Sequence, residues 1–334
     1  MSEEVEVPGT DPRPDPEPGP PVEAALARLV ERTGSRALLV VVDFDGTIAE
    51  IDPHPMGATI LPLARRALRR LARLATEQPD RLSVAILSGR TAADVAGRVR
   101  VGGLLYLGNH GNEGGRLPRG WPAERLPVAL LPELAPFAPR ARQLGEAVAA
   151  AIAERDHDRP PPPPPAWLHV EDKGPAVAFH YRSAADHAAA LAALDAAIAR
   201  AAEAGLTEGF RRLDGRLVVE FQPTGTIDKG EAVARLIERY RPAGALVIGD
   251  DRADALAFAV IREGRRSGRL VDGLAVAVEG GREVPAEVRA AADIVLPRPR
   301  DAARLLDRLA ARLEGSVGSG GPPGPATPRG PRPA

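Results

Sequence analysis

The stretch that decides the fold is "ALLVVVDFDGTIAE", which covers residues 37–50. It begins as a near-continuous apolar run, and such a run is typical of a strand buried on both faces of a parallel sheet. Three further runs share this character: "LSVAIL" at 82–87, "LLYLG" at 104–108 and "ALVIGD" at 245–250. Segments with a helical spacing of apolar residues, at 62–75 and 91–100, separate the first three runs. This alternation of strand and helix predicts an open α/β sheet.

Composition excludes several classes of function. The chain of 334 residues carries a formal net charge of −1 and only 3% aromatic residues, so neither a nucleic-acid surface nor a base-stacking platform is expected. It contains no cysteine, which removes disulfides, thiolate zinc sites and cysteine nucleophiles. The N-terminal stretch is acidic and proline-rich, unlike a secretory signal, and the longest apolar runs are too short to span a bilayer. We therefore expect a soluble cytoplasmic protein with no nucleic-acid or membrane partner.

The middle of the chain differs from its flanks. Long helical stretches alternate there with strand-like runs such as "AWLHVED", "AVAFHYR" and "RLVVEFQ", which suits an antiparallel sheet with helices on one face. The proline run 160–165 in this block is expected to be an extended loop or spacer, with a polyproline ligand for a partner as the alternative. The predicted organisation is a disordered N-terminal tail (1–22), an α/β core (36–112 and 224–312), an inserted α+β domain (113–223) and a disordered C-terminal tail (313–334).

Two aspartates follow the first strand with one residue between them. Asp43 and Asp45 lie at the carboxyl end of that strand, where open α/β sheets bind their ligands. With this spacing both carboxylates point the same way, and they repel each other unless a cation lies between them. A single aspartate after a strand is commonly a helix cap or a turn residue, but that interpretation leaves the second charge unexplained. The pair therefore indicates a cation site.

The segment "DFDGT" at 43–47 resembles the first motif of the haloacid dehalogenase (HAD) superfamily, whose phosphatases use an aspartate nucleophile. Three other segments resemble the remaining motifs in the right order: "LSGR" at 87–90, "DKG" at 228–230 and "GDDRAD" at 249–254. The motifs span nearly all of the chain between its two tails. The resemblance implies a HAD-like α/β fold, in which an open parallel sheet forms the core and the inserted α+β domain forms a cap. It also implies that the chain is a phosphatase.

The resemblance assigns roles to the acidic residues. Asp43 would be the nucleophile that forms an aspartyl-phosphate, and Asp45 would protonate the leaving group and then activate the hydrolytic water. Mg²⁺ would mask the negative charge of the phosphate and would be held by Asp43, Asp250 and the backbone carbonyl of Asp45. Asp254 would orient this metal site from behind its direct ligands.

Only two of the 44 basic residues are lysines, and both lie in the tripeptide Asp-Lys-Gly. Lysine and arginine are not interchangeable where a compact ammonium group must reach one oxygen in a tight pocket. The resemblance gives Lys229 the role of neutralising Asp43 and the phosphate. It also implies that Ser88 and the backbone amides of Gly89 and Thr47 donate hydrogen bonds to the phosphoryl oxygens.

Four local phrases resemble the trehalose-6-phosphate phosphatase family in particular. They are "GNHGNE" at 108–113, "VEDKGPAVAFHYR" at 170–182, "VVEFQP" at 218–223 and "GDDRADALAF" at 249–258. Glu113, Lys173 and Glu220 are the candidate contacts for disaccharide hydroxyls, and solvated edge charges are the alternative for the two glutamates. The resemblance adds these substrate contacts: Arg90, Asn109 and Arg182.

The function implied by the resemblance is the magnesium-dependent hydrolysis of trehalose 6-phosphate to trehalose and phosphate, the last step of trehalose biosynthesis. A trehalose-6-phosphate synthase would then be a pathway partner. Two alternatives stay open: a related sugar phosphatase that acts on sucrose 6-phosphate or a glycosyl-3-phosphoglycerate, and a receiver-like phospho-acceptor module. Asp45 and the large cap argue against a receiver. The fourth motif departs from the family pattern, with Ala253 in place of a threonine and Ala255-Leu256 after the last aspartate, which bears on how Asp254 is oriented.

Overall fold

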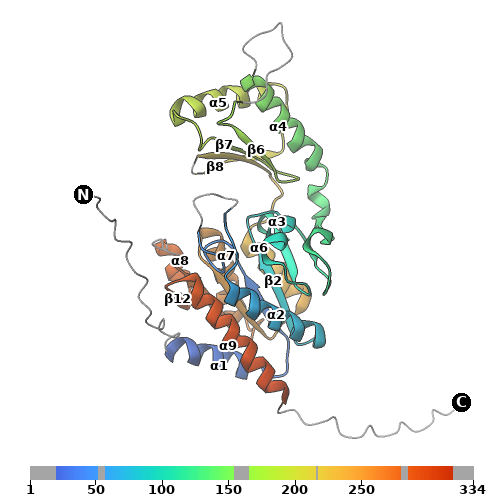
Figure 1. Cartoon of the computed structure of the whole chain (residues 1–334), viewed down its shortest axis with the longest axis vertical. Helices are drawn as coiled ribbons and strands as arrows, with labels where there is room; N and C mark the ends of the chain where they lie inside the picture. Colours follow the sequence, from blue (N-terminus) through green and yellow to red (C-terminus); the bar gives the residue numbers. More distant parts are fainter. Residues whose placement is uncertain (1–19, 52–56, 154–164, 216, 280–284, 319–334) are drawn as a thin grey trace, which may run out of the picture.

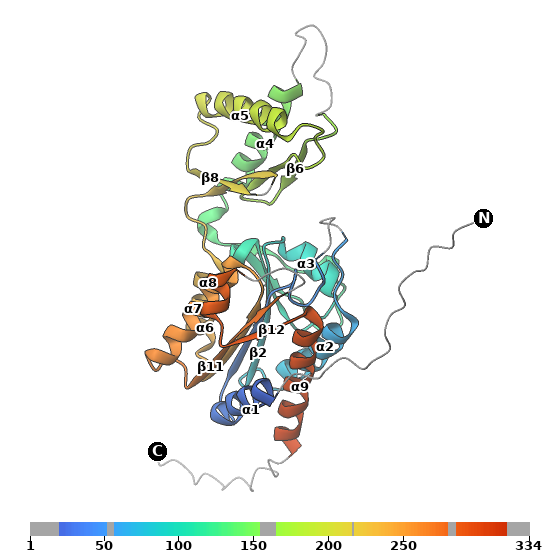
Figure 2. The ribbon, with the colours of Figure 1, turned by 90° about the vertical axis from the view of Figure 1, so that its left-hand side faces the viewer.

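The computed structural model describes residues 20–51, 57–153, 165–215, 217–279 and 285–318. It contains two β-sheets, each covered by helices (Figure 1). The larger sheet is built from both ends of the described chain, whereas the smaller sheet is built from its middle and lies at one end of the molecule (Figure 2). Among the described residues, no helix combines the length and the apolar character needed to cross a bilayer.

The larger sheet has eight strands in the order β12-β11-β10-β1-β2-β3-β4-β5. They are β1 (Leu38–Val42), β2 (Leu82–Leu87), β3 (Leu105–Gly108), β4 (Glu113–Arg116), β5 (Ala129–Leu130), β10 (Gly244–Gly249), β11 (Asp272–Val278) and β12 (Ile294–Leu296). The strands from β12 to β3 are parallel, whereas β4 and β5 pair antiparallel. Within β1, Val40 packs into the core on one face and Val41 into the core on the other. Burial on both faces explains why the central strands are continuous apolar runs.

Helices cover both faces of the larger sheet. On one face lie α1 (Pro20–Thr33), α2 (Pro62–Glu77), α3 (Ala92–Val99) and α9 (Pro299–Gly318), and on the other lie α6 (Lys229–Tyr240), α7 (Arg252–Arg266) and α8 (Ala286–Ala291). Arg70 of α2 pairs with Asp307 and Glu314 of α9 at 2.7 and 2.6 Å, which fixes these two helices against each other above their shared apolar stripe. Three short 3-10 turns lie between β3 and α4: η1 (Asn109–Gly111), η2 (Ala123–Arg125) and η3 (Pro132–Leu134).

The smaller sheet is antiparallel throughout, in the order β6-β7-β9-β8. Its strands are β6 (His169–Asp172), β7 (Val177–His180), β8 (Phe210–Gly215) and β9 (Val218–Pro223). The helices α4 (Phe137–Ala153) and α5 (His187–Glu203) cover one face, where Phe179 and Phe221 form the centre of a separate apolar core. The other face carries polar side chains and is turned toward the larger sheet (Figures 1 and 2). We call this unit the cap.

The predicted fold class, an α/β sheet with an inserted α+β cap, is confirmed. The strands expected at 37–44, 82–87, 104–108 and 245–250 correspond to β1, β2, β3 and β10. The expected α+β content of the middle is also found, since β6 and β7 lie within two of the strand-like runs recognised there and β9 overlaps the third.

Several details differ from the expectation. α1 begins at Pro20 and α9 continues to Gly318, so residues 20–22 and 313–318 are helical and do not belong to disordered tails, because Val22 and Leu313 pack against the core. β4 and β5 belong to the larger sheet, although the cap was expected to begin at residue 113. β8 was not expected because most of its side chains are exposed and it pairs only with β9. The expected tails up to residue 19 and from 319 onward, and residues 160–164 of the proline run, lie outside the described residues.

Candidate active site

The candidate site lies at the carboxyl edge of the larger sheet. Because β1, β2, β3 and β10 are parallel neighbours, the residues that follow them meet at the same edge. These residues are Asp43 after β1, Ser88 after β2, Asn109 after β3 and Asp250 after β10. The first, second and fourth predicted motifs are therefore brought together by the topology of the sheet, and the third lies at the start of α6.

Lys229 is the most deeply buried charged side chain of the site, with 1% of its surface exposed. It is the first residue of α6, where Asp228 caps the helix. Its Nζ donates to Asp43 Oδ1 and to Asp254 Oδ1, both at 2.8 Å. Burial alone would lower the pKa of Lys229, but the carboxylates of Asp254 and Asp43 outweigh it and raise this pKa well above its ordinary value. The ammonium group is therefore charged and fixed against the expected nucleophile.

Asp43 is also buried, with 5% exposed, and its second oxygen accepts a hydrogen bond from Thr47 Oγ1 at 3.2 Å. Burial raises the pKa of Asp43 to about 7, which Lys229 partly offsets and Asp250 reinforces. Burial likewise raises the pKa of Asp250 to about 8, with further contributions from Asp254 and Asp251. The site therefore holds several carboxylates close together, and the single positive charge of Lys229 does not neutralise all of them.

The carboxylates of Asp43, Asp250 and Asp254 each offer an oxygen within 4.8 Å of the others. Gly46 makes room for this cluster, because a Cβ at that position would overlap the Asp250 carboxylate, and its φ of 71° favours glycine. Hard carboxylate oxygens with raised pKa values suit a divalent cation, which would relieve their repulsion. The donor set therefore fits a metal site.

Asp254 differs from the other two carboxylates because both of its oxygens already have donors. Oδ1 accepts from Lys229, and Oδ2 accepts from the backbone N–H groups of Asp250 and Asp251 at 3.0 and 3.2 Å. Asp254 and Asp251 also form the capping box of α7. None of these bonds involves Ala253 or Leu256, so the departures in the fourth motif leave the orientation of Asp254 intact. This geometry supports the expected positioning role of Asp254 behind Asp43 and Asp250.

Asp45 lies in a two-pronged ion pair with Arg90. Arg90 Nε donates to Asp45 Oδ2 at 2.7 Å and Nη2 donates to Oδ1 at 2.8 Å, while Nη1 donates to Asp94 at 3.1 Å. Sequence analysis predicted a direct contact between Arg90 and substrate, but here its guanidinium group holds the carboxylate of Asp45. Arg90 is therefore placed to fix the orientation of Asp45.

Ser88 and Gly89 line the same edge. Ser88 is buried and its Oγ accepts a hydrogen bond from the backbone N–H of Arg90 at 3.1 Å, which leaves the hydroxyl proton for another acceptor. Gly89 lies against the ring of His110, a residue that sequence analysis did not single out. Thr47 is bound to Asp43, as described above. The structure thus brings the predicted phosphate donors together around Asp43.

Glu113 has a different role from the one expected. Its side chain is buried, with 8% of the residue exposed, and Oε1 accepts the backbone N–H of Ala92 at the start of α3 at 2.6 Å. A carboxylate at a helix N-terminus is stabilised there by the free N–H groups. Glu113 is therefore neither a solvated edge charge nor a residue that reaches the cap. Burial makes it a structural link between β4 and α3.

Asn109 joins the core to the cap. Its Nδ2 donates to the backbone oxygen of Lys173 at 3.0 Å, in the turn between β6 and β7. Its Oδ1 is buried and lacks a hydrogen-bond partner within the described residues. Asn109 therefore holds the cap turn over the site, and its contact with substrate stays a prediction.

A polar cluster on the open face of the cap sheet lies around Lys173. Lys173 Nζ donates to Glu220 Oε2 at 3.0 Å and lies 4.0 Å from Glu171 Oε2. Gln222 Nε2 donates to the other oxygen of Glu220 at 2.7 Å, and His180 Nε2 lies 2.9 Å from Glu171 Oε2. The hydrogen bond with His180 is the largest cause that lowers the pKa of Glu171.

Of this cluster, sequence analysis found Lys173 and Glu220 and missed the other three members. Glu171 and His180 lie in the phrase "VEDKGPAVAFHYR", and the alternation of the strands places them on the same face.

Arg182 lies just beyond β7 and is exposed, and its backbone oxygen accepts a hydrogen bond from His187 at 3.1 Å. Its contact with substrate stays a prediction.

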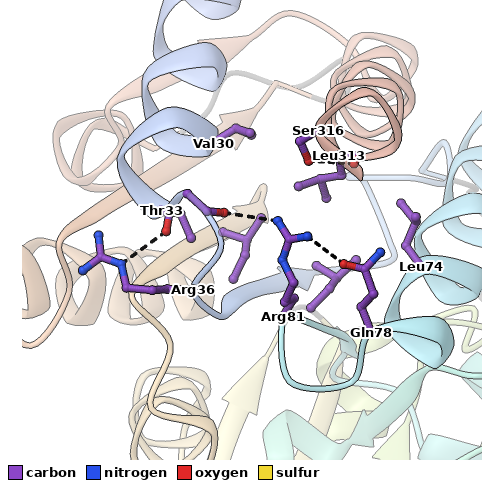
Figure 3. Close-up of a pocket in the computed structure, with 11 residues that line it drawn as sticks. Val30, Thr33, Arg36, Leu74, Gln78, Arg81, Leu313 and Ser316 are labelled. Atoms are coloured by element: carbon purple, nitrogen blue, oxygen red, sulfur yellow. Dashed lines mark hydrogen bonds between the residues drawn. The ribbon is translucent and has the colours of Figure 1, made fainter. Parts of the chain in front are cut away.

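A small cavity lies elsewhere, where α1, α2 and α9 meet the starts of β1 and β2 (Figure 3). Leu74, Leu313 and Val30 provide apolar walls, and Arg81 is bonded to Gln78. The cavity has a volume of about 20 Å³, enough for about one water molecule. No carboxylate lines it, and it is on the opposite edge of the sheet from Asp43. It is a packing defect and not the active site.

Comparison with known proteins identifies relatives of this chain. A family model described as trehalose-phosphatase matches residues 41–126 and 168–292. A trehalose-phosphate phosphatase of Mycolicibacterium paratuberculosis is 32% identical over 305 residues, which cover 90% of this chain and 68% of that protein. An uncharacterized glycosyl hydrolase of Mycobacterium tuberculosis is 33% identical over 306 residues, and this chain spans only 20% of its length.

Solved structures agree on the fold. The C-terminal domain of a Candida albicans trehalose-6-phosphate phosphatase matches with a TM-score of 0.60 at 20% identity, covering 88% of this chain and 98% of that one. An Aspergillus fumigatus trehalose-6-phosphate phosphatase matches with a TM-score of 0.54 at 23% identity, covering 86% and 97%. At these identities the similarity establishes the shared architecture of core and cap.

The crowded carboxylates predict an effect on stability. Asp250→Asn should raise the melting temperature of the chelator-treated protein at about pH 9. Above its raised pKa, Asp250 carries a negative charge that repels the neighbouring carboxylates and destabilises the folded state, and asparagine removes this charge. The gain should shrink at about pH 6, where Asp250 of the parent is protonated and the repulsion is already lost.

Thermal unfolding in chelator measures this effect, and a relief of about 1 kcal/mol corresponds to roughly 2–4 °C. Asp214→Asn, which removes an exposed carboxylate of β8, is the matched control and should change little at either pH. An Asp250→Asn protein that melts below its parent at the higher pH would contradict the crowding of the site.

Proposed function

Because this chain belongs to the trehalose-phosphatase family, we propose that it hydrolyses trehalose 6-phosphate to trehalose and phosphate, the last step of trehalose biosynthesis. The observation that carries this proposal is the pairing of two charged centres. A nucleophile centre built on Lys229 and Asp43 lies in the core, and a sugar-binding cluster built on Lys173 and Glu220 lies in the cap above it. Asn109 ties the two together through the cap turn.

In the first half of the proposed reaction, Asp43 attacks phosphorus and the bond from phosphorus to the sugar oxygen breaks. The resulting aspartyl-phosphate carries the phosphoryl group on the Asp43 carboxylate. Lys229 and the Ser88 hydroxyl donate to the phosphoryl oxygens as charge moves onto them. Asp45 gives its proton to the departing sugar oxygen, which leaves as a hydroxyl group.

In the second half, Asp45 accepts a proton from water, and the water attacks the phosphorus of the aspartyl-phosphate. The bond from phosphorus to the Asp43 oxygen breaks, which releases inorganic phosphate and regenerates the Asp43 carboxylate. Arg90 donates to both oxygens of Asp45 and so keeps its carboxylate in one orientation. The first half requires the protonated form, so Asp45 must loosen from Arg90 when substrate is bound. Arg90 thus acts on the reaction through Asp45.

The cofactor we propose is Mg²⁺, held by Asp43, Asp250 and the backbone carbonyl of Asp45. When bound, it masks the negative charge of the phosphate and of the nucleophile. Asp254 keeps Lys229 and the adjacent backbone in place behind these ligands.

In the cap, we propose that Glu171, Lys173 and Glu220 bind the disaccharide hydroxyls. Carboxylates accept from hydroxyls and the ammonium group donates to them, and both kinds of bond are stronger than neutral ones. His180 and Gln222 hold the two carboxylates in position.

We also propose that the protein acts in the cytoplasm and receives its substrate from a trehalose-6-phosphate synthase.

A substrate panel tests the proposal. Trehalose 6-phosphate, sucrose 6-phosphate and a glycosyl-3-phosphoglycerate are each incubated with the protein and Mg²⁺, and released phosphate is measured. Trehalose 6-phosphate should have the highest kcat/KM. A higher value for either of the other two would move the function to a related sugar phosphatase, and no release from any of them would remove the enzymatic proposal.

Asp43→Asn should abolish turnover, because an amide is a poor nucleophile and a weak metal ligand. Asp45→Asn should lower kcat by roughly 10²–10⁴-fold through the loss of acid–base catalysis. Phosphate release under saturating substrate measures both effects. Asp214→Asn serves as the control, and substantial turnover by Asp43→Asn would rule out the covalent mechanism.

Removal of the metal should stop the reaction. Chelation with EDTA should reduce phosphate release to background, and Mg²⁺ should restore it, because carboxylate oxygens suit a hard cation. Metal analysis of the chelated protein must accompany the assay. Full activity in protein shown to be free of metal would disprove the proposed cofactor.

The two lysines should separate the core from the cap. Lys229→Arg should impair hydrolysis of every phosphomonoester, including p-nitrophenyl phosphate, because a planar guanidinium group cannot replace the ammonium between Asp43 and Asp254. Lys173→Ala should lower kcat/KM for trehalose 6-phosphate by a factor that corresponds to about 1–3 kcal/mol of transition-state stabilisation. It should leave kcat/KM for p-nitrophenyl phosphate almost unchanged. Equal losses on both substrates in both variants would contradict this division of labour.

A further inference from the structure

His110 has a strained backbone next to the catalytic centre. Its φ is 61°, and Asn109 before it has a φ of 48°, so two successive non-glycine residues adopt the left-handed region. Such a conformation is unfavourable for a residue with a side chain and persists only where the surroundings enforce it. The backbone N–H of His110 donates to Ser88 O at 2.9 Å, which fixes the turn to the end of β2. The left-handed backbone conformation therefore fixes the direction of the His110 side chain.

The His110 side chain lies beside Gly89. A Cβ built on Gly89 would lie 3.0 Å from His110 Cε1 and 3.2 Å from Nε2, closer than side chains normally approach. The missing side chain at position 89 thus leaves room for the imidazole ring. The ring is half-buried, and within the described residues neither of its nitrogens takes part in a hydrogen bond. A polar ring is held in position with its hydrogen-bonding capacity unused.

The ring is surrounded by charges from both parts of the molecule. From the core, Lys229 and Asp251 act on it, and from the cap, Lys173 and Glu220 do so. Burial, followed by the charge of Lys229, lowers the pKa of His110 to about 4. The imidazole is therefore uncharged near neutral pH, where it can donate one hydrogen bond and accept another. Its pKa is too low for a general base working near neutrality.

We propose that His110 binds the sugar ring that carries the phosphate, with its imidazole hydrogen-bonded to a hydroxyl next to the phosphoester. His110 lies between the nucleophile centre and the cap cluster. With the phosphate at Asp43 and the rest of the disaccharide in the cap, the phosphate-bearing sugar ring would lie at this position. The inference rests on the proposed function and deepens it by assigning a specificity residue that belongs to the core. Glu171, Lys173 and Glu220 of the cap then bind the remainder of the disaccharide.

Substitution tests this assignment. His110→Ala should lower kcat/KM for trehalose 6-phosphate about 10-fold, mainly through KM, because it removes one hydrogen bond that orients the sugar. Hydrolysis of p-nitrophenyl phosphate should stay within about twofold of the parent, since that substrate has no sugar hydroxyl. His110→Gln, which keeps a donor and an acceptor, should recover part of the loss. Asp214→Asn is again the control, because Asp214 is exposed in β8 and pairs with Arg212.

The outcomes separate the inference from the function on which it rests. If the parent hydrolyses trehalose 6-phosphate and His110→Ala does so equally well, the inference alone is overturned. Equal losses on both substrates would also overturn it, since they would point to a general disturbance of the site. If the parent does not hydrolyse trehalose 6-phosphate at all, the proposed function fails and the inference fails with it.

A second measurement does not depend on a variant that folds. The parent protein, labelled with ¹⁵N in its histidines, is titrated with trehalose and, separately, with inorganic phosphate. Trehalose should shift the side-chain resonances of His110 and phosphate alone should shift them less. A His110 signal that responds to phosphate and not to trehalose would place the ring at the phosphate and overturn the assignment.

Discussion

The ammonium group of Lys229 is the interaction on which the site depends. It is buried between Asp43 and Asp254, and its loss would leave two buried carboxylates close together without a counter-charge. This ion-pair triad connects the start of α6 to the residue that follows β1 and to the first turn of α7. It also sets the direction of Asp43, because one oxygen is fixed by Lys229 and the other by Thr47. The proposed nucleophile is therefore positioned by the protein's own side chains.

The cap supplies what the core lacks. The core edge carries groups for a phosphate and a cation, whereas the open face of the cap sheet carries carboxylates and an ammonium group for hydroxyls. The two meet at the strained turn of Asn109 and His110, which bonds the cap turn on one side and contacts Gly89 on the other. In the proposed reaction, substrate selection and chemistry are thus carried by separate parts that share one junction.

Sequence reasoning predicted the elements whose signal is local. The apolar runs of β1, β2, β3 and β10 identified the parallel sheet. The four motifs predicted candidate site residues that the structure brings close together, since Asp43, Asp45, Ser88 and Asp250 follow parallel strands and Lys229 begins α6. It could not show that Arg90 pairs with Asp45 or that Glu113 bonds Ala92, since both contacts depend on side-chain directions across the fold. His110 gave no periodic or compositional signal, because its importance comes from a backbone conformation that only the packed structure enforces.

The chemistry assigned to Asp43 can be observed by trapping the intermediate. If Asp45 is needed to activate water, the Asp45→Asn protein should hydrolyse the aspartyl-phosphate more slowly than it forms it, so the intermediate should accumulate. This protein is mixed with trehalose 6-phosphate and Mg²⁺ and quenched in acid. Peptide mapping by mass spectrometry should find one phosphoryl group on the peptide that contains Asp43, and sequencing should place it on that residue. A phosphoryl group on another residue, or trehalose released in a single turnover with no phosphorylated peptide, would contradict the mechanism.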